Sequence, residues 1–371
     1  MAKNVIYFKG LNGIRAIAAV SVLLSHITLA LSNFGLKSNL LGYTDTGETK
    51  TLDLAGYGVT IFFVLSGFLI TYLLLVEKEQ TSTVSIKKFY WRRLLRIWPL
   101  YFSYLFLSLC IAIYFDISVN SSSVFYYIIF SANVPFILGT SLPFLSHYWS
   151  LAVEEQFYIF WPFFSLFRVK VMLMLSVIII IILIWTKGFL HIYHPNSLLE
   201  TIIHVSRFHC ILIGAVAAML YFLKHKLFIL LTTSKLSQLL TWMWLIFIAL
   251  NKFHIASFLD NELVSIFAVL LIMSQICEAP LLSMENRLFN FLGTISFGLY
   301  VYHPLLIYLL SKVLIVSNSE SVLWTIIVYL LCTLLTIIVA QISFKYLEQP
   351  FLKYKKKKYT IVGSARNADR L

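Results

Sequence analysis

Long apolar stretches alternate with short polar ones along almost the whole of this 371-residue chain. A helix of about 20 apolar residues crosses the hydrocarbon core of a membrane, and ten stretches approach or exceed that length. We expect these spans near residues 10–32, 55–76, 97–116, 149–167, 171–186, 200–223, 236–250, 258–276, 288–310 and 321–345. Their apolar residues are continuous rather than alternating, which excludes a transmembrane β-barrel.

One further apolar stretch, residues 124–145, does not fit a plain crossing. It contains polar and helix-breaking residues, namely Asn133, Pro135, Gly139 and Pro143. Irregular backbone is tolerated at membrane depth only where protein covers it, so we expect a short re-entrant or interfacial segment. The pattern as a whole predicts an all-α, polytopic integral membrane protein with about ten transmembrane helices. We assign residues 1–346 to a transmembrane domain and residues 347–371 to a basic cytoplasmic tail.

Composition and charge support this class and suggest an orientation. Hydrophobic residues make up 60% of the chain and charged residues only 12%, whereas soluble domains carry about 25% charged residues. Most lysines and arginines fall in segments that are cytoplasmic if the chain starts inside, as the positive-inside rule requires. We therefore expect both termini in the cytoplasm. The basic residues that give the chain its net charge of +13 then contact anionic lipid headgroups of the bilayer, and we expect no nucleic-acid partner.

Arg15 and His26 interrupt the first apolar span and are its most informative residues. The eleven helical steps between them make about three turns and about 16 Å, so both side chains project from nearly the same face. Ionisable groups inside a span are costly and by default mark a functional path. We expect Arg15 near the cytoplasmic surface and His26 well inside the membrane.

A second basic group lies in IKKFYWRRLLRIWP, at the cytoplasmic end of the third predicted span. Arg93 and Arg96 are three residues apart, so they share one face of a helix. Paired guanidinium groups bind phosphate oxygens bidentately, which suits a polyphosphate ligand. Lys87 and Lys88 are better interpreted as anchors at the membrane surface.

Two adjacent carboxylates, Glu154 and Glu155, begin an otherwise apolar span on the predicted outer side. Their side chains point about 100° apart, so at most one of them faces a given cavity. A carboxylate beside an intramembrane histidine can orient the ring and stabilise its charged form. The alternative is that both carboxylates interact only with the dipole of their helix.

Arg207 lies at depth between His204 and His209, and a buried arginine requires an anionic partner. The two flanking histidines and His303 are each interpreted as packed or hydrogen-bonded side chains. The four cysteines occupy four different apolar segments without metal-ligand spacing, so we expect no metal site.

Several of these segments, taken together, resemble the membrane acyltransferase-3 family. The matching motifs are Arg15-x10-His26, GVTIFFVLSGFLIT (58–71), RRLLR (92–96), WSLAVEEQFY (149–158), ISFGLYVYHP (295–304) and YLEQPF (346–351). Each motif is weak by itself, but the resemblance covers essentially the whole chain in the family's order and spacing. The last motif departs from the family, since Gln349 stands where an arginine is commoner.

The resemblance implies acyl transfer across a membrane. Such proteins take an acyl group, usually acetyl, from cytoplasmic acyl-CoA and place it on a hydroxyl of an extracytoplasmic carbohydrate. Acetyl-CoA is then the donor substrate, and we expect no permanently bound cofactor. The residues that match catalytic positions are His26, Glu154 and Glu155. The residues that we group as donor-binding are Arg15, Arg93, Arg96 and Arg207.

The same resemblance predicts a multi-pass protein of the bacterial inner membrane. His26 then acts either as a general base or as a transient acyl carrier. The acceptor stays open among lipopolysaccharide O-antigen, capsule, exopolysaccharide, peptidoglycan and smaller glycosides. Many relatives carry a fused extracytoplasmic hydrolase-like domain; we expect a stand-alone form that transfers directly or uses a separate extracytoplasmic partner. The rival interpretation is a transporter or a flippase of a glycan precursor, which performs no bond chemistry.

Overall fold

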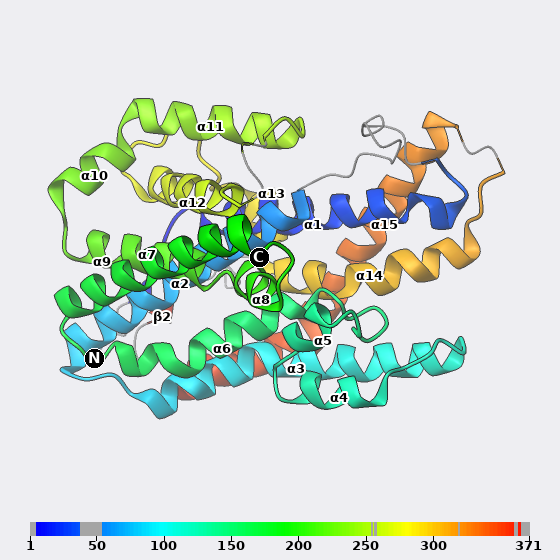
Figure 1. The fold of residues 1–371 in the computed structure, drawn as a ribbon, viewed down its shortest axis with the longest axis horizontal. Helices are drawn as coiled ribbons and strands as arrows, with labels where there is room; N and C mark the ends of the chain where they lie inside the picture. The colour runs from blue at the N-terminus through cyan, green and yellow to red at the C-terminus, as the bar shows by residue number, and fades with distance from the viewer. Residues whose placement is uncertain are drawn as a thin grey trace.

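The computed structural model describes residues 5–37, 54–253, 255, 258–317, 320–359 and 363–364. They form a helical bundle in which most long helices lie side by side along the longest axis (Figure 1). The α-helices are α1 (Leu11–Ala30), α2 (Leu54–Thr81), α3 (Ile86–Tyr114), α4 (Ser121–Ile128), α5 (Asn133–Ile137), α6 (Tyr148–Phe164), α7 (Val169–Tyr193), α8 (Leu198–Ser206), α9 (Phe208–Phe222), α10 (Lys226–Thr233), α11 (Lys235–Ala249), α12 (Asp260–Ile276), α13 (Arg287–Thr294), α14 (Ser296–Val313), α15 (Val322–Ser343) and α16 (Gln349–Lys358). The other elements are a 3₁₀ turn, η1 (Leu31–Phe34), a π-helical turn, η2 (Phe344–Glu348), and two short strands, β1 (Val5–Ile6) and β2 (Gly363–Ser364), which pair in parallel.

Six helices of the described chain are long and apolar enough to cross a membrane. They are α1 with η1, α2, α3, α7, α8 with α9, and α15 continued through η2 and α16. The pair α13 and α14 passes the same test together, but the two helices are bent by 64° relative to each other. These helices confirm the predicted all-α, multi-pass membrane protein.

The remaining three predicted spans are occupied by shorter helices. α6 and α12 have 17 residues each and α11 has 15, against about 20 for a full crossing. Each predicted span therefore coincides with one helix or with two consecutive helices, and the total of ten crossings stays a prediction.

The segment that sequence marks as irregular consists of two short helices, α4 and α5, joined by non-helical backbone. Phe130 and Gly139 have positive φ angles of 56° and 68°, which end the two helices. The buried Tyr127 hydroxyl satisfies backbone groups of this segment by accepting from the Leu142 amide and donating to the Leu145 carbonyl. The segment is thus not one continuous crossing helix, and its re-entrant or interfacial placement stays a prediction.

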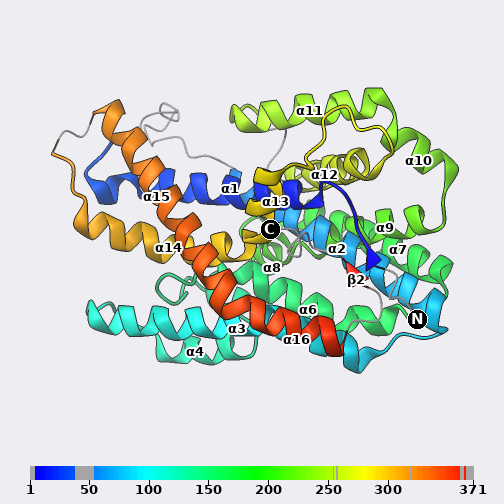
Figure 2. The same ribbon diagram turned by 180° about the vertical axis from the view of Figure 1, so that it is seen from behind.

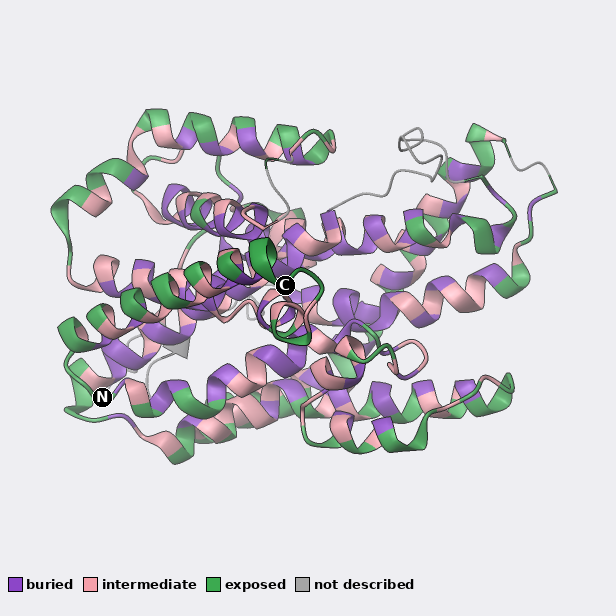
Figure 3. Cartoon of the chain, viewed as in Figure 1, coloured by how far each residue is buried: buried purple, intermediate pink, exposed green. Residues whose placement is uncertain are grey.

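The centre of the bundle is α2, which packs between α1 and α9. Buried residues concentrate on these helices and on α14, whereas α7, α10 and α11 expose much of their surface (Figure 3). Glycines allow the closest approach: a Cβ on Gly67 would lie 1.9 Å from the Ile211 carbonyl oxygen, and one on Gly214 would lie 2.0 Å from that of Val64. Small residues at helix contacts are the usual means of close packing inside a membrane.

The last helices form one long diagonal across the back of the bundle (Figure 2). α15 continues through η2 into α16, which packs against α3. Residue 346, the predicted boundary of the transmembrane domain, lies within η2 of this continuous helix. Residues 360–362 and 365–371 of the predicted basic tail lie outside the described residues.

Candidate active site

A basic cavity lies between five helices that are distant in sequence: α1, α2, α3, α6 and α14. It holds about 970 Å³ of empty space, part of it open to solvent. Its principal polar residues are Arg15, Arg93, Arg96, Ser150, Glu154, Tyr158 and Tyr300. Sites for small organic ligands likewise combine a few polar groups with a mostly apolar wall.

The structure brings together three of the four arginines that sequence groups as donor-binding. Arg15 is oriented from within α1, where its Nη1 donates to Asn12 Oδ1 at 3.0 Å. The guanidinium of Arg93 lies over the rings of Tyr158 and Phe89, at 5.2 Å and 5.7 Å from their centroids. Its buried Nε has no hydrogen-bond partner among the described residues. Buried donors in native proteins normally have a hydrogen-bond partner, and the described residues do not supply one for this atom.

Glu154 faces this cavity, and Glu155 is not among its lining residues. The difference follows from their 100° separation around α6. Glu154 Oε2 accepts a hydrogen bond of 2.9 Å from Tyr158, whose hydroxyl also bonds Ser66 on α2. Within the described part of the chain, neither glutamate forms a hydrogen bond or an ion pair with His26. The expected carboxylate–histidine pair is therefore not formed, because α6 directs Glu154 towards the arginines.

His26 meets a different partner, His303 of α14. The Nδ1 atom of His26 lies 2.6 Å from Nε2 of His303, and the two rings are within 10° of parallel. His303 is fully buried, and its ring also packs 5.3 Å from that of His147. From sequence alone His303 could not be distinguished from a packed histidine. The one available signal was its position in an apolar span directly before Pro304.

Tyr300 and Ser150 separate the cavity from these histidines. Both line the cavity, and their hydroxyls lie 2.6 Å apart. The Tyr300 hydroxyl donates to the His147 carbonyl at 2.8 Å, and its ring lies 5.3 Å from that of His147 and 6.0 Å from that of His303. His26 itself is not among the lining residues. The basic cavity and the histidine group are thus neighbours that share a wall.

Arg207 lies elsewhere, at the junction of α8 and α9, where its φ of 45° breaks the predicted single helix. Its Nη1 donates to the Gly56 carbonyl at 3.0 Å and to Thr60 Oγ1 at 3.1 Å, and the guanidinium lies 5.3 Å from the Trp149 ring centroid. The structure therefore does not bring Arg207 to the other arginines. We expected an anionic partner for Arg207, but the guanidinium bonds directly to neutral oxygens at the start of α2.

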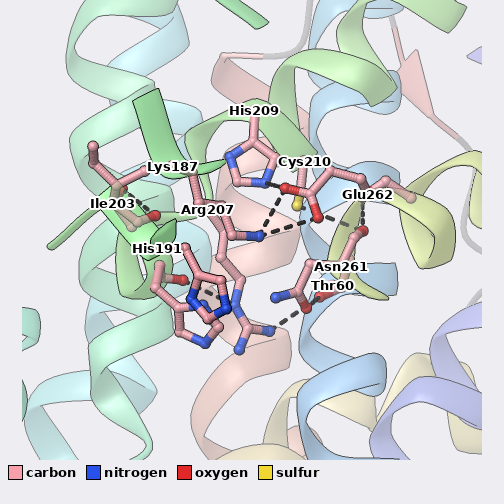
Figure 4. Close-up of polar contacts among 12 residues, drawn as sticks. Thr60, Lys187, His191, Ile203, Arg207, His209, Cys210, Asn261 and Glu262 are labelled. Carbon is pink, nitrogen blue, oxygen red and sulfur yellow. Dashed lines mark hydrogen bonds and ion pairs between the residues drawn. The ribbon is translucent and has the colours of Figure 1, made fainter. Parts of the chain in front are cut away.

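A buried ionic group beside Arg207 was not anticipated from sequence (Figure 4). Lys187 Nζ lies 2.8 Å and 3.1 Å from the two carboxylate oxygens of Glu262, and His209 Nε2 lies 3.0 Å from one of them. Glu262 occurs inside an apolar span, and that was the signal for a buried partner. Lys187 gave no such signal, because it lies at the end of its own predicted span, where a lysine is ordinary.

The fold and the site define a multi-pass membrane protein with a basic internal cavity. The sequence model of one family, described as an acyltransferase domain, matches residues 8–342. The chain therefore belongs to the acyltransferase-3 family.

Related proteins are similar over almost the whole chain. The peptidoglycan O-acetyltransferase OatA of Listeria monocytogenes is 27% identical over 377 residues, covering 94% of this chain and 56% of that protein. The O-acetyltransferase OatA of Staphylococcus aureus is 27% identical over 385 residues, covering 94% and 57%. The chain thus spans a little over half the length of these relatives. No solved structure matches it significantly.

Proposed function

We propose that this protein is a membrane O-acyltransferase that moves an acetyl group from cytoplasmic acetyl-CoA to a hydroxyl of an extracytoplasmic glycan. The observation that carries the proposal is the basic cavity of Arg15, Arg93 and Arg96, which shares a wall with the His26–His303 pair. Family membership supports the reaction class. The two relatives are named as O-acetyltransferases, one of them for peptidoglycan, which favours a cell-wall sugar as the acceptor.

The donor fits the chemistry of the cavity. Coenzyme A carries phosphates at one end and a long, thin arm that ends in the thioester. Guanidinium forks bind phosphates bidentately, and Arg15, Arg93 and Arg96 all line the cavity. The apolar part of the wall, including Phe62 and Leu69, suits the arm. In this proposal the arm extends towards Tyr300, and a movement of that wall brings the thioester to His26.

The reaction requires one proton to be moved and one acyl bond to be exchanged. In a direct transfer, His26 takes the proton of the acceptor hydroxyl while its oxygen attacks the thioester carbonyl. The carbon–sulfur bond then breaks, and the CoA thiolate receives the proton from the imidazolium. In the covalent alternative, His26 first attacks the thioester and holds the acetyl group as acyl-imidazole until the hydroxyl takes it. Both routes yield an O-acetyl ester and free CoA thiol.

The location that we propose is a bacterial inner membrane with both chain termini in the cytoplasm. The asymmetric distribution of lysine and arginine supports this orientation. It puts the amino-terminal end of α1, which carries Arg15, on the side where acetyl-CoA is available. Transfer to the glycan is direct or passes through a separate extracytoplasmic partner.

The proposal is tested with purified protein in lipid nanodiscs that receives radiolabelled acetyl-CoA and soluble peptidoglycan fragments. We expect free CoA thiol and label that is released from the sugar by mild alkali, as an ester is. Binding of the fragments without any release of thiol would instead favour the transporter or flippase. A parallel set of other bacterial polysaccharides identifies the acceptor.

A further inference from the structure

We propose that His303 is a positioning residue that holds His26 in the Nδ1–H tautomer, so that Nε2 of His26 is the reactive nitrogen. The tautomer follows from the geometry of the two rings. Its role in turnover rests on the proposed function.

The assignment begins at a backbone carbonyl. Nδ1 of His303 lies 3.2 Å from the Leu299 carbonyl oxygen, one turn earlier in α14. A carbonyl oxygen can only accept, so Nδ1 of His303 carries the proton. A neutral imidazole has one donor and one acceptor nitrogen, which makes Nε2 of His303 an acceptor. The atom 2.6 Å from it, Nδ1 of His26, must then donate.

The opposite arrangement is excluded by the same contacts. If His26 presented an unprotonated Nδ1, then Nε2 of His303 would have to be the donor. Nδ1 of His303 would then face the Leu299 carbonyl oxygen in one of two states. It would be unprotonated, so that two acceptors face each other, or it would be the second N–H of a doubly protonated, cationic ring. Two acceptors repel each other. Within the described part of the chain no carboxylate bonds to His303, and an uncompensated charge in this fully buried position is strongly unfavourable.

The surroundings fix His303 more firmly than His26. His303 is fully buried, and its ring is packed between those of His147 and His26, with centroid distances of 5.3 Å and 4.8 Å. His26 is partly exposed. His303 is thus a fixed acceptor on one side of the more accessible His26 ring. A catalytic base is oriented by its hydrogen-bond partner in the same way.

The consequence concerns the face of His26 turned away from His303. With Nδ1 protonated, the lone pair is on Nε2, which is free to accept a proton or an acetyl group. When Nε2 takes the proton, the Nδ1–H bond to His303 becomes charge-assisted and therefore stronger. His303 stays neutral throughout, so it orients and stabilises His26 without exchanging a proton with the substrate.

Two amide substitutions separate the roles of the two ring nitrogens. In His303→Gln the longer side chain can put its carbonyl oxygen near the former Nε2 position and still accept from His26. In His303→Asn the shorter side chain can reach the Leu299 carbonyl as Nδ1 does, but not His26. We expect turnover of acetyl-CoA within several-fold of wild type for His303→Gln. For His303→Asn we expect a loss of about a hundredfold or more in kcat with an unchanged KM for acetyl-CoA.

A spectroscopic measurement tests the tautomer without relying on activity. Protein labelled with 15N-histidine is reconstituted in lipid bilayers, and the His26 signals are identified by their disappearance in His26→Gln. We expect an unprotonated Nε2 and a protonated Nδ1 in the wild type and in His303→Gln, and loss of this pattern in His303→Asn. An exposed-loop variant, His225→Asn, controls for the general effect of losing a histidine.

Two results would overturn the inference. One is a wild-type spectrum in which His26 carries its proton on Nε2. The other is equal turnover of His303→Asn and wild type at matched thermal stability. If wild-type protein released no CoA thiol, the proposed function would fail, whereas the wild-type spectrum would still decide the tautomer.

Discussion

Tyr158 donates a hydrogen bond to Glu154, one turn earlier on α6, and so fixes a carboxylate on the wall that carries three arginines. This relationship changes what the glutamate pair is expected to do. An outer carboxylate assisting His26 would affect turnover alone. A carboxylate among donor-binding arginines affects the affinity for an anionic donor.

Glu154→Gln is therefore expected to strengthen the binding of CoA. The amide still accepts from Tyr158, but one negative charge leaves the cavity, which is worth about 1 kcal/mol or a several-fold fall in Kd. Glu155→Gln is the matched control, since Glu155 does not line the cavity. Calorimetric titration with CoA measures both affinities. Weaker binding by Glu154→Gln than by Glu155→Gln would count against this electrostatic role.

Arg93→Lys tests phosphate recognition. Lysine keeps the charge but loses the bidentate fork and the buried Nε, so the KM for acetyl-CoA should rise about tenfold while kcat changes less. The variant should also distinguish acetyl-CoA from its dephospho form less well than wild type does. Lys88→Ala, at an exposed position of the same helix, should change neither constant. If all three proteins preferred acetyl-CoA over its dephospho form to the same extent, the arginines would not be part of the donor site.

Gly67→Ala tests the close packing of α2 against α9. The added methyl group would overlap the Ile211 carbonyl, and forcing helices apart costs about 1–3 kcal/mol. Gly188→Ala on α7 is the control, because nothing lies within 4 Å of the added Cβ; alanine there should be neutral or stabilising. Thermal unfolding in detergent should show a lower midpoint for Gly67→Ala only. Equal midpoints would mean that the two helices are not packed as described.

Lys187→Met tests the buried ionic group beside Arg207. It leaves Glu262 without its lysine in a buried position, and breaking such a pair costs about 3–5 kcal/mol. The double variant Lys187→Met/Glu262→Leu should recover much of the loss, because no unpaired carboxylate remains and His209, which loses its contact with Glu262, can be neutral. Lys37→Met removes the exposed pair with Glu320 and should have little effect. A double variant no more stable than the single one would show that the pair has a different role.

The local pattern of the sequence accounts for the membrane-spanning helices and for the shared face of Arg93 and Arg96. Spacing along one helix predicts such features because it depends only on helical geometry. It did not reveal the pairing of His26 with His303, which depends on how α1 packs against α14. Nor did it reveal the break at Arg207, where a left-handed backbone conformation and neutral oxygens from α2 replace the expected anion. Both features arise from tertiary contacts between distant segments.

The central claim is tested most directly in proteoliposomes that enclose acetyl-CoA and a thiol reagent, with the glycan acceptor outside. The protein is selected for the orientation with its termini in the lumen. We expect enclosed CoA thiol and external O-acetyl glycan to appear at equal rates for wild type, and neither to appear for correctly inserted His26→Ala and His26→Gln. Full transfer by His26→Ala, or glycan movement without thiol release by wild type, would contradict the account.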